Sequence, residues 1–388
     1  MKFKRIFLII LDSLGVGESP DADKFNDKGA NTLKHIQENR ELFVPNLKKL
    51  GFLNTINMDE NLNVDAYYTI AKPINVGKDS LSGHYELTGI HDEVAFKTFM
   101  NKGFPIELVE AIEQVTGKRV IGNKCDDTES IINELGERHL NYGSLILYTT
   151  RDSNLNIAAH EDVIPVSHLY HYCEKIRQIT LREEWKVGRV SARPFAGTPG
   201  NFKEIKGERK DYAIKPPHRS LLNNLKDHEY SVIAVGKVSD LFDSEGISKN
   251  LKAINNSEAI NKINDIMDKD FTGLCIANLS DFDYYGHKRN LEGYASSIED
   301  LDVEIPMMLN KLNKEDLLIF TADHGCDPAF SGSDHTRENV PVIIFSRAFK
   351  EPKRLEPLNT LADIGATIAE NFAVEPLEIG TSLLEKLQ

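Results

Sequence analysis

Short, continuous apolar runs that end in polar or acidic residues are the feature that most limits how this chain can fold. Six such runs occur, at residues 6–11, 145–148, 232–236, 274–279, 317–321 and 340–346. Continuous rather than alternating apolar character predicts strands that are buried on both faces of a parallel sheet. Helical patterns occur between them, at 105–115, 166–184, 258–267, 291–312 and 360–372. This alternation of strand and helix predicts an α/β fold.

The length of the chain favours two domains. At 388 residues it exceeds the ~250 to 300 residues at which one hydrophobic core usually stops growing. The segment 97–215 differs in character from the rest, with a Gly-Phe-Pro sequence near its start and a Pro-Pro pair just after its end. We therefore expect a discontinuous core at 1–96 and 216–388, with 97–215 inserted as a cap domain.

Charge and cysteine content limit the partners and the compartment. A net charge of −14 opposes binding to nucleic acid, so an anionic small substrate would need a local positive site. Four widely spaced cysteines without a CxxC pair indicate a reduced, cytoplasmic environment. No apolar stretch approaches the ~20 residues that span a bilayer, and the first run is too short for a signal peptide. The oligomeric state is left open.

Acidic residues follow three of the predicted strands. Asp12, Asp283 and Asp323 come at or shortly after strand ends, where open α/β sheets bind their ligands. His287 follows Asp283 by four residues, and Gly286 allows the backbone to approach closely. This spacing suits a metal site, although a histidine that caps a helix is the alternative for this segment.

Two further histidines strengthen the metal interpretation. Asp323 and His324 are adjacent at a buried strand end, where they are costly unless something binds them, and His335 follows eleven residues later. Three carboxylates and three imidazoles suit Mn²⁺, Zn²⁺ or a similar ion. Two ions ~3.5 to 4 Å apart would use the whole set and would clamp the oxygens of a phosphoryl displacement. Cys326 is expected to pack beside the ligands rather than to bind metal.

A candidate nucleophile lies in the segment 77–86, which is rich in small and polar residues and carries hydroxyls at Ser80 and Ser82. A serine beside a metal ion can be activated without a histidine base, because coordination lowers the pKa of the hydroxyl. The alternative is a helix N-terminus that uses Ser or Asp as its cap.

Several motifs resemble phosphopentomutase, a member of the alkaline phosphatase superfamily. They lie at residues 12–22, 78–84, 157–161, 321–325 and 334–338, and in the cap at 193–195, 199–202 and 211–213. The resemblance runs nearly end to end. It implies an alkaline-phosphatase-like core with a mostly parallel central sheet and an inserted α/β cap. The implied enzyme holds two Mn²⁺ ions and interconverts ribose or deoxyribose 1-phosphate and 5-phosphate.

The same resemblance assigns roles to individual residues. One metal ion would take Asp283, His287 and His335, and the other Asp12, Asp323, His324 and the Ser80 oxygen. Phosphorylated Ser80 would be the active form, which exchanges its phosphoryl group with a sugar bisphosphate that also serves as activator. Lys237 and Arg193 match basic family positions that hold phosphate or sugar groups. Asp152 matches a cap acid that faces the ribose.

Four departures from the family pattern are present. The nucleophile, usually Thr, is Ser80, and the interval from Asp283 to His287 is one residue shorter than usual. The cap motif at 122–130 is altered, with Asp126 and Asp127 in place of small neutral residues.

The fourth departure is Arg151, which stands beside Asp152 where a small residue is expected. An extra fixed charge near the sugar predicts a preferred sugar phosphate that differs from, or is broader than, that of typical family members. Alternatively, Asp126 and Asp127 neutralise Arg151 and leave specificity unchanged.

Other functions fit the sequence less well. The same metal pair with water as acceptor would make a phosphatase or phosphodiesterase, and the cap is what favours a mutase. A sulfatase lacks support because the segment 80–83 does not carry the Cys/Ser-x-Pro-x-Arg pattern. A binding protein on a decayed enzyme scaffold would have lost ligands, and all six Asp and His positions are present.

Overall fold

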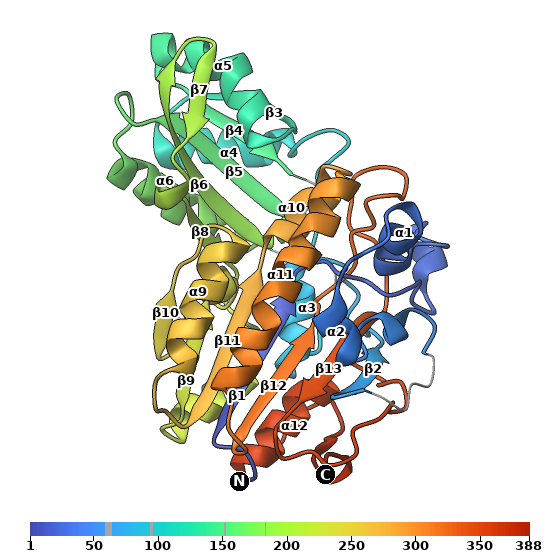
Figure 1. The fold of residues 1–388 in the computed structure, drawn as a ribbon. Coiled ribbons are helices and arrows are strands. Elements are labelled where there is room, and N and C mark those ends of the chain that lie inside the picture. The colour runs from blue at the N-terminus through green and yellow to red at the C-terminus, as the bar shows by residue number, and fades with distance from the viewer. Residues whose placement is uncertain (59–63, 94–95, 151–152, 183) are drawn as a thin grey trace. The chain divides into compact units, whose positions relative to one another are not determined.

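The computed structural model describes residues 1–58, 64–93, 96–150, 153–182 and 184–388. The chain forms two compact units, which Figure 1 draws. The first comprises Met1–Ala95, Pro216–Ser239 and Ser244–Gln388, and the second comprises Phe96–Lys215 and Asp240–Asp243. The predicted cap segment lies in the second unit, and its role as a cap stays a prediction.

A seven-stranded sheet runs through the described part of the first unit, in the order β10-β9-β11-β1-β12-β13-β2. The strands are β1 (Arg5–Leu11), β2 (Tyr67–Ala71), β9 (Ser231–Val235), β10 (Lys249–Leu251), β11 (Gly273–Leu279), β12 (Asp316–Thr321) and β13 (Val340–Phe345). The five strands from β10 to β12 are mutually parallel, and every residue of β1, β11 and β12 is buried. The predicted α/β class with a mostly parallel central sheet is confirmed.

The direction of one strand in this sheet differs from the prediction. β13 corresponds to the apolar run 340–346 but is antiparallel to both of its neighbours, β12 and β2. A continuous apolar run reports burial on both faces, and that burial does not depend on strand direction. The parallel assignment of this run was therefore wrong.

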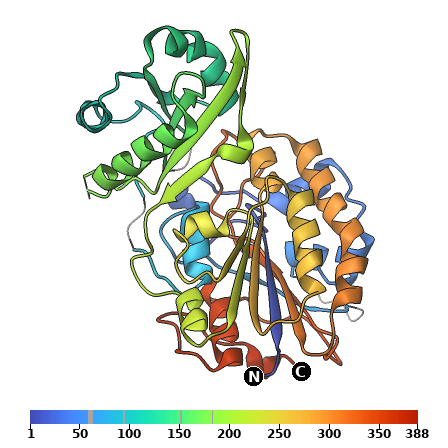
Figure 2. The same ribbon diagram turned by 90° about the vertical axis from the view of Figure 1, so that its left-hand side faces the viewer.

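Helices cover both faces of the sheet in the first unit, as Figures 1 and 2 show. On one face lie α9 (Asn256–Met267) and α11 (Leu291–Lys311), and on the other lie α3 (Ser80–Leu87), α7 (Leu221–Asp227) and α12 (Ala362–Phe372). Further helices with residues in this unit are α1 (Thr32–Asn39), α2 (Pro45–Lys49) and α10 (Asp281–His287), and α8 (Val238–Leu241) has residues in both units. This arrangement of three layers leaves the carboxyl ends of the parallel strands as the place for a site.

The second unit has its own mixed sheet and its own core. Its strands are β3 (Val120–Cys125), β4 (Leu145–Thr149), β5 (Asn154–His160), β6 (Arg189–Thr198), β7 (Asn201–Glu204) and β8 (Lys210–Ala213). The helix α5 (Thr128–Tyr142) packs on one face, and α4 (Ile106–Thr116) and α6 (Val166–Thr180) pack on the other. The apolar run 145–148, which lies in the predicted cap segment, is β4 of this second sheet, parallel to β3 and antiparallel to β5.

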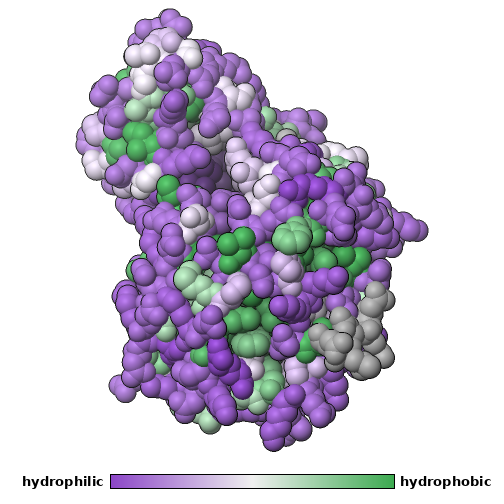
Figure 3. Space-filling view, in the orientation of Figure 1, coloured by the Kyte–Doolittle hydropathy of each residue, from purple (hydrophilic) through white to green (hydrophobic). Residues whose placement is uncertain are grey.

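The face drawn in Figure 3 is mostly hydrophilic, with apolar side chains in smaller groups between the polar ones. Among the helices of the described residues, none combines the length and the apolar character needed to cross a membrane.

Candidate active site

Three neighbouring strands bring the predicted metal ligands to one edge of the sheet. β1 ends directly before Asp12, and β12, paired in parallel beside it, ends two residues before Asp323. On the other side of β1, β11 leads into α10, which carries Asp283 and His287. Since parallel strands end on the same side, the acids that follow them converge.

The first group of potential ligands consists of Asp12, Asp323 and His324, all buried. The Nε2 atom of His324 lies 3.5 Å from Asp12 Oδ1 and 3.6 Å from Asp323 Oδ2. Asp323 Oδ2 is shielded from solvent and lies 3.2 Å from Nδ1 of the buried His84. An ionised oxygen in that condition is costly unless a cation neutralises it.

The second group consists of Asp283, His287 and His335. Asp283 Oδ1 lies 3.1 Å from Nε2 of His335 and 3.5 Å from Nε2 of His287. Asp283 and His287 are four residues apart in α10 and therefore project from one face of that helix. The helix and the metal interpretations of this segment are thus compatible.

A glycine lets α10 approach the loop beyond β12. A Cβ at Gly286 would lie 2.8 Å from both the carbonyl oxygen and the sulfur of Cys326. Cys326 is buried, with its sulfur 4.0 Å from His287 Nδ1 and 3.3 Å from a guanidinium nitrogen of Arg289. It belongs to neither ligand group and packs against them.

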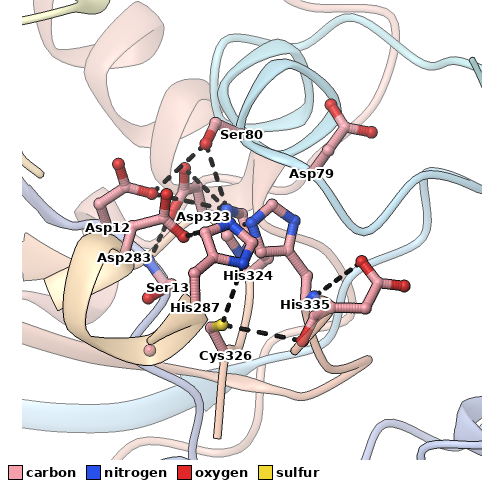
Figure 4. A network of polar contacts seen from close by, with 12 residues as sticks. Asp12, Ser13, Asp79, Ser80, Asp283, His287, Asp323, His324, Cys326 and His335 are labelled. Atoms are coloured by element: carbon pink, nitrogen blue, oxygen red, sulfur yellow. Dashed lines mark hydrogen bonds and ion pairs between the residues drawn. The ribbon is translucent and has the colours of Figure 1, made fainter. Parts of the chain in front are cut away.

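The two groups adjoin, as Figure 4 shows. The ring of His335 lies 4.0 Å from the ring of His324 and 4.5 Å from that of His287, measured between centroids. Two backbone contacts orient these rings: His287 Nδ1 lies 2.8 Å from the carbonyl oxygen of Ser333, and His324 Nδ1 lies 3.1 Å from that of Gly325. A proton on Nδ1 leaves each Nε2 lone pair free for a metal ion.

Burial and neighbouring charges shift the pKa of three groups in this cluster. Burial raises the pKa of Asp283, but His287 and His335 outweigh it and hold that pKa well below its usual range. The pKa of Asp323 is lowered in the same way, against its burial, chiefly by His324. Burial lowers the pKa of His324, but Asp323 and Asp12 raise it to about 10. Each group of carboxylate and imidazole donors therefore fits a divalent cation, which would displace the imidazole protons.

Ser80 is the first residue of α3, and its hydroxyl points at the first ligand group (Figure 4). Its Oγ lies 3.2 Å from His324 Nε2 and 3.4 Å from Asp12 Oδ1. The Lys237 ammonium donates to Ser80 Oγ at 2.9 Å and also pairs with Asp12. A hydroxyl with this surrounding is placed to share a metal ion with Asp12 and to be polarised by Lys237.

The helix-cap alternative for this segment also holds, through a different residue. The Asp79 side chain accepts from the backbone N–H groups of Leu81 and Ser82, and it points away from the ligand groups in Figure 4. The Ser82 hydroxyl donates to Asp79 at 2.9 Å and is buried. Cap and candidate nucleophile are therefore neighbouring residues with separate tasks.

His84 was not singled out from the sequence, although it joins the nucleophile to a ligand. It is fully buried, and its Nδ1 lies 2.8 Å from the carbonyl oxygen of Ser80 and 3.2 Å from Asp323 Oδ2. Its position four residues after Ser80 repeats the interval between Asp283 and His287. This four-residue interval in the sequence could have indicated that His84 lies on the same helix face as Ser80.

The predicted substrate-binding residues are distributed over both units. Lys237 lies in the first unit beside Ser80, whereas Arg193 lies on β6 of the second unit, where it bonds Glu204 at 2.9 Å and Asn156 at 3.0 Å. Arg151 and Asp152 lie outside the described residues.

Two acids were weighed as partners of Arg151, whose own contacts lie outside the described residues. Asp126 pairs with Lys124 at 3.0 Å, and Asp127 caps the N-terminus of α5.

Comparisons with known proteins show the family to which this chain belongs. The model of the metalloenzyme superfamily matches residues 4–376. Similar solved structures include phosphoglycerate mutase from Leishmania mexicana at low cobalt concentration, 12% identical over 98% of this chain and 97% of that one, with a TM-score of 0.47. A protein of the alkaline phosphatase superfamily from Vibrio parahaemolyticus is 12% identical over 100% and 71% of the two chains, with a TM-score of 0.46. A protein from Pyrococcus horikoshii is 14% identical over 95% and 97%, with a TM-score of 0.48. On the extent of the family match, the chain belongs to the metalloenzyme superfamily.

Proposed function

We propose that this chain is a sugar-phosphate mutase of the phosphopentomutase type, which moves a phosphoryl group between the 1- and 5-positions of ribose or deoxyribose. One observation carries the proposal. The Ser80 hydroxyl lies within 3.5 Å of a carboxylate and an imidazole of one ligand group and of the Lys237 ammonium, and the second ligand group adjoins the first. This is the arrangement that phosphoryl transfer through a serine requires.

In this proposal Asp12, Asp323, His324 and Ser80 hold one divalent ion, and Asp283, His287 and His335 hold the other, with Mn²⁺ as the expected metal. When bound, the ions neutralise charge on the phosphoryl oxygens and lower the pKa of the Ser80 hydroxyl.

The protein's own part in the transfer is as follows. Phosphorylated Ser80 gives its phosphoryl group to a free hydroxyl of the sugar monophosphate, so that the new P–O bond forms as the bond to Ser80 Oγ breaks. Ser80 Oγ regains the proton that the accepting hydroxyl loses, and Lys237 stabilises the negative charge on Ser80 Oγ until that proton arrives. The bisphosphate then gives its other phosphoryl group back to Ser80, and a small amount of sugar bisphosphate activates unphosphorylated enzyme.

Exclusion of water separates a mutase from a phosphatase that uses the same groups. We assign this task to the second unit, with Arg193 and Asp152 holding the substrate and Arg151 altering the sugar preference. The charge that Arg151 adds beside Asp152 is the basis for a changed or broader preference.

A mutase assay tests the proposal. Purified protein with Mn²⁺ and a trace of ribose 1,5-bisphosphate is given ribose 5-phosphate, deoxyribose 5-phosphate and a panel of other pentose and hexose phosphates, and free phosphate is measured in parallel. We expect isomerisation to exceed phosphate release for at least one sugar. Phosphate release without isomerisation would assign the chain as a phosphatase. Ribose 5-phosphate as the best substrate, with an unchanged preference in Arg151→Ala, would refute the altered specificity alone.

A further inference from the structure

Arg337 lies two residues after the candidate ligand His335, and only 2% of its surface is exposed. A guanidinium has five N–H donors in a fixed plane, and here each of them has an acceptor. Nε and Nη2 form a fork with the Asp21 carboxylate, at 2.9 and 3.1 Å. The other three donors bind backbone carbonyl oxygens, those of Asn75 at 2.7 Å, Gly77 at 2.9 Å and Pro73 at 3.1 Å.

The three carbonyl groups belong to the segment that leads into the candidate nucleophile. Ser80, which begins α3, is three positions after Gly77. Arg337 therefore holds alternate residues of the chain immediately before Ser80, while its own backbone continues from His335. One side chain thus joins the segment of a ligand to the segment of the nucleophile.

A second basic side chain crosses between the same two segments in the opposite direction. Lys78, two residues before Ser80, pairs with Asp334 at 3.1 Å and with Asp27 at 2.8 Å. The same Asp27 oxygen accepts the backbone N–H of Arg337 at 2.8 Å. The two connections therefore share one carboxylate.

We propose that Arg337, supported by Lys78, is a positioning residue that fixes Ser80 relative to the metal ligands before substrate binds. This inference rests on the proposed function in taking Ser80 as the group that carries phosphate. A buried charge adds little to stability, since the cost of its desolvation offsets most of what its partners contribute. Five oriented donors instead impose one geometry on the segment they bind, and lysine or an apolar residue cannot reproduce it. A displacement of ~1 Å in such a group costs about 10²-fold in rate.

The test compares Arg337→Met with Arg289→Met. Arg289 is a matched control, because it also binds backbone carbonyl groups beside the ligands, those of Gly286, Gly332 and Asp334, and none in the segment before Ser80. At saturating Mn²⁺ we expect Arg337→Met to bind the metal, to keep KM within about threefold and to lose about 10²-fold in kcat. Arg289→Met should keep kcat within about threefold and show weaker Mn²⁺ binding.

Further variants distinguish a role in positioning Ser80 from a general contribution to the stability of the fold. Guanidinium ion added to Arg337→Ala should restore part of kcat, whereas methylammonium, a single ammonium donor, should not. Arg337→Lys should stay impaired. Lys78→Met changes a less buried position and should lower kcat about tenfold. This variant tests the proposal if the Arg337 variants fail to fold. A loss of kcat equal in the Arg337 and Arg289 variants, or a proportional rise in KM without loss of kcat, would overturn the proposal.

A readout that needs no substrate keeps this inference separate from the proposed function. Hydrogen exchange of the amides in residues 73–82 should be faster in Arg337→Met than in the wild type and unchanged in Arg289→Met. If the wild type carries no phosphate on Ser80, the proposed function fails, and the exchange result still decides whether Arg337 orders this segment. Unchanged exchange in Arg337→Met would refute the inference even for an active enzyme.

Discussion

At the scale of single residues, two hydroxyls in one helix have different surroundings. Ser80 and Ser82 are two residues apart, about 200° around an α-helix, so their side chains leave on nearly opposite sides. Ser80 faces Asp12, His324 and Lys237, whereas Ser82 is bonded to the cap Asp79. A Cβ at Gly77 would lie 1.9 Å from Ser82 Oγ, so this hydroxyl has no room for a phosphoryl group.

We therefore expect phosphate on Ser80 alone. After incubation with ribose 1,5-bisphosphate and Mn²⁺, mass spectrometry should place it on the peptide that contains Ser80, and within that peptide on this residue. Ser80→Ala should abolish labelling and transfer, while Ser82→Ala should keep activity within about tenfold, because it removes one hydrogen bond to the cap. A fully active Ser80→Ala enzyme would refute the assignment of Ser80 as the residue that carries phosphate.

Asp323 is the residue whose removal should affect the metals most. It contributes the buried Oδ2 to the first group, and its Oδ1 accepts the backbone N–H of Ser13 at 3.0 Å. We expect Asp323→Ala to bind one Mn²⁺ where the wild type binds two, and to lose at least about 10²-fold in activity. The readout is metal content after dialysis.

A neighbouring acid is the control for this substitution. Asp281 opens α10 and accepts from the backbone of Asn256 at 2.9 Å, outside both ligand groups. Asp281→Asn should retain two ions. Two ions in Asp323→Ala, or none in the wild type supplied with Mn²⁺, would contradict the assignment of the ligands.

At the scale of elements, α3 carries the candidate nucleophile and is held at both its start and its middle. Asp79 caps its first turn, and Gly83 lies so close to the loop after β12 that a Cβ would be 2.2 Å from the carbonyl oxygen of Asp323. Loss of either feature would move Ser80 relative to Asp323, so the local structure of this helix and the geometry of the site are coupled.

Two helix caps should separate stability from activity. Asp79→Ala and Asp127→Ala each remove an aspartate that accepts backbone N–H groups, in α3 and α5 respectively. Each should lower the free energy of unfolding by about 1 kcal/mol. Only Asp79→Ala should also lower kcat, by about tenfold or more, since it loosens the turn that holds Ser80. Denaturant unfolding and steady-state kinetics measure the two effects, and an Asp79→Ala enzyme with wild-type kcat would show that the cap does not position the nucleophile.

At the scale of the whole molecule, Glu338 connects three distant parts of the first unit. It is buried, accepts from the hydroxyl of Thr336 at 2.6 Å and from Thr32 at 2.7 and 2.8 Å, and lies 3.2 Å from the N–H of Gly17. Burial raises its pKa from 4.5 to about 7, with Asp327 adding to the shift against these hydrogen bonds. The folded protein therefore favours the protonated acid more than the unfolded chain does.

The raised pKa of Glu338 makes the stability of the folded protein depend on pH. The contribution of Glu338 to stability is complete below its unfolded pKa and is lost as the pH rises through about 7. The Glu338→Gln variant cannot ionise at this position. Relative to it, the free energy of unfolding of the wild type should fall by about 2 kcal/mol between about pH 5.5 and 8.5. Urea unfolding of both proteins after metal removal measures this, and a difference that does not change with pH would show that the pKa of Glu338 is not raised.

The sequence by itself determined the α/β class, the six apolar strands and the acids and histidines at their ends, because burial on both faces and costly polar residues at strand ends leave local patterns. The sequence analysis missed β2, β10 and most strands of the second unit. These strands are short or mix polar and apolar residues, and β10 is largely exposed. The direction of β13 and the contacts of His84 and Arg337 became visible only in the folded structure. The reason is physical: the fork between Arg337 and Asp21 joins residues 316 positions apart, and a contact of that range depends on how strands pair and helices pack rather than on neighbours in the chain.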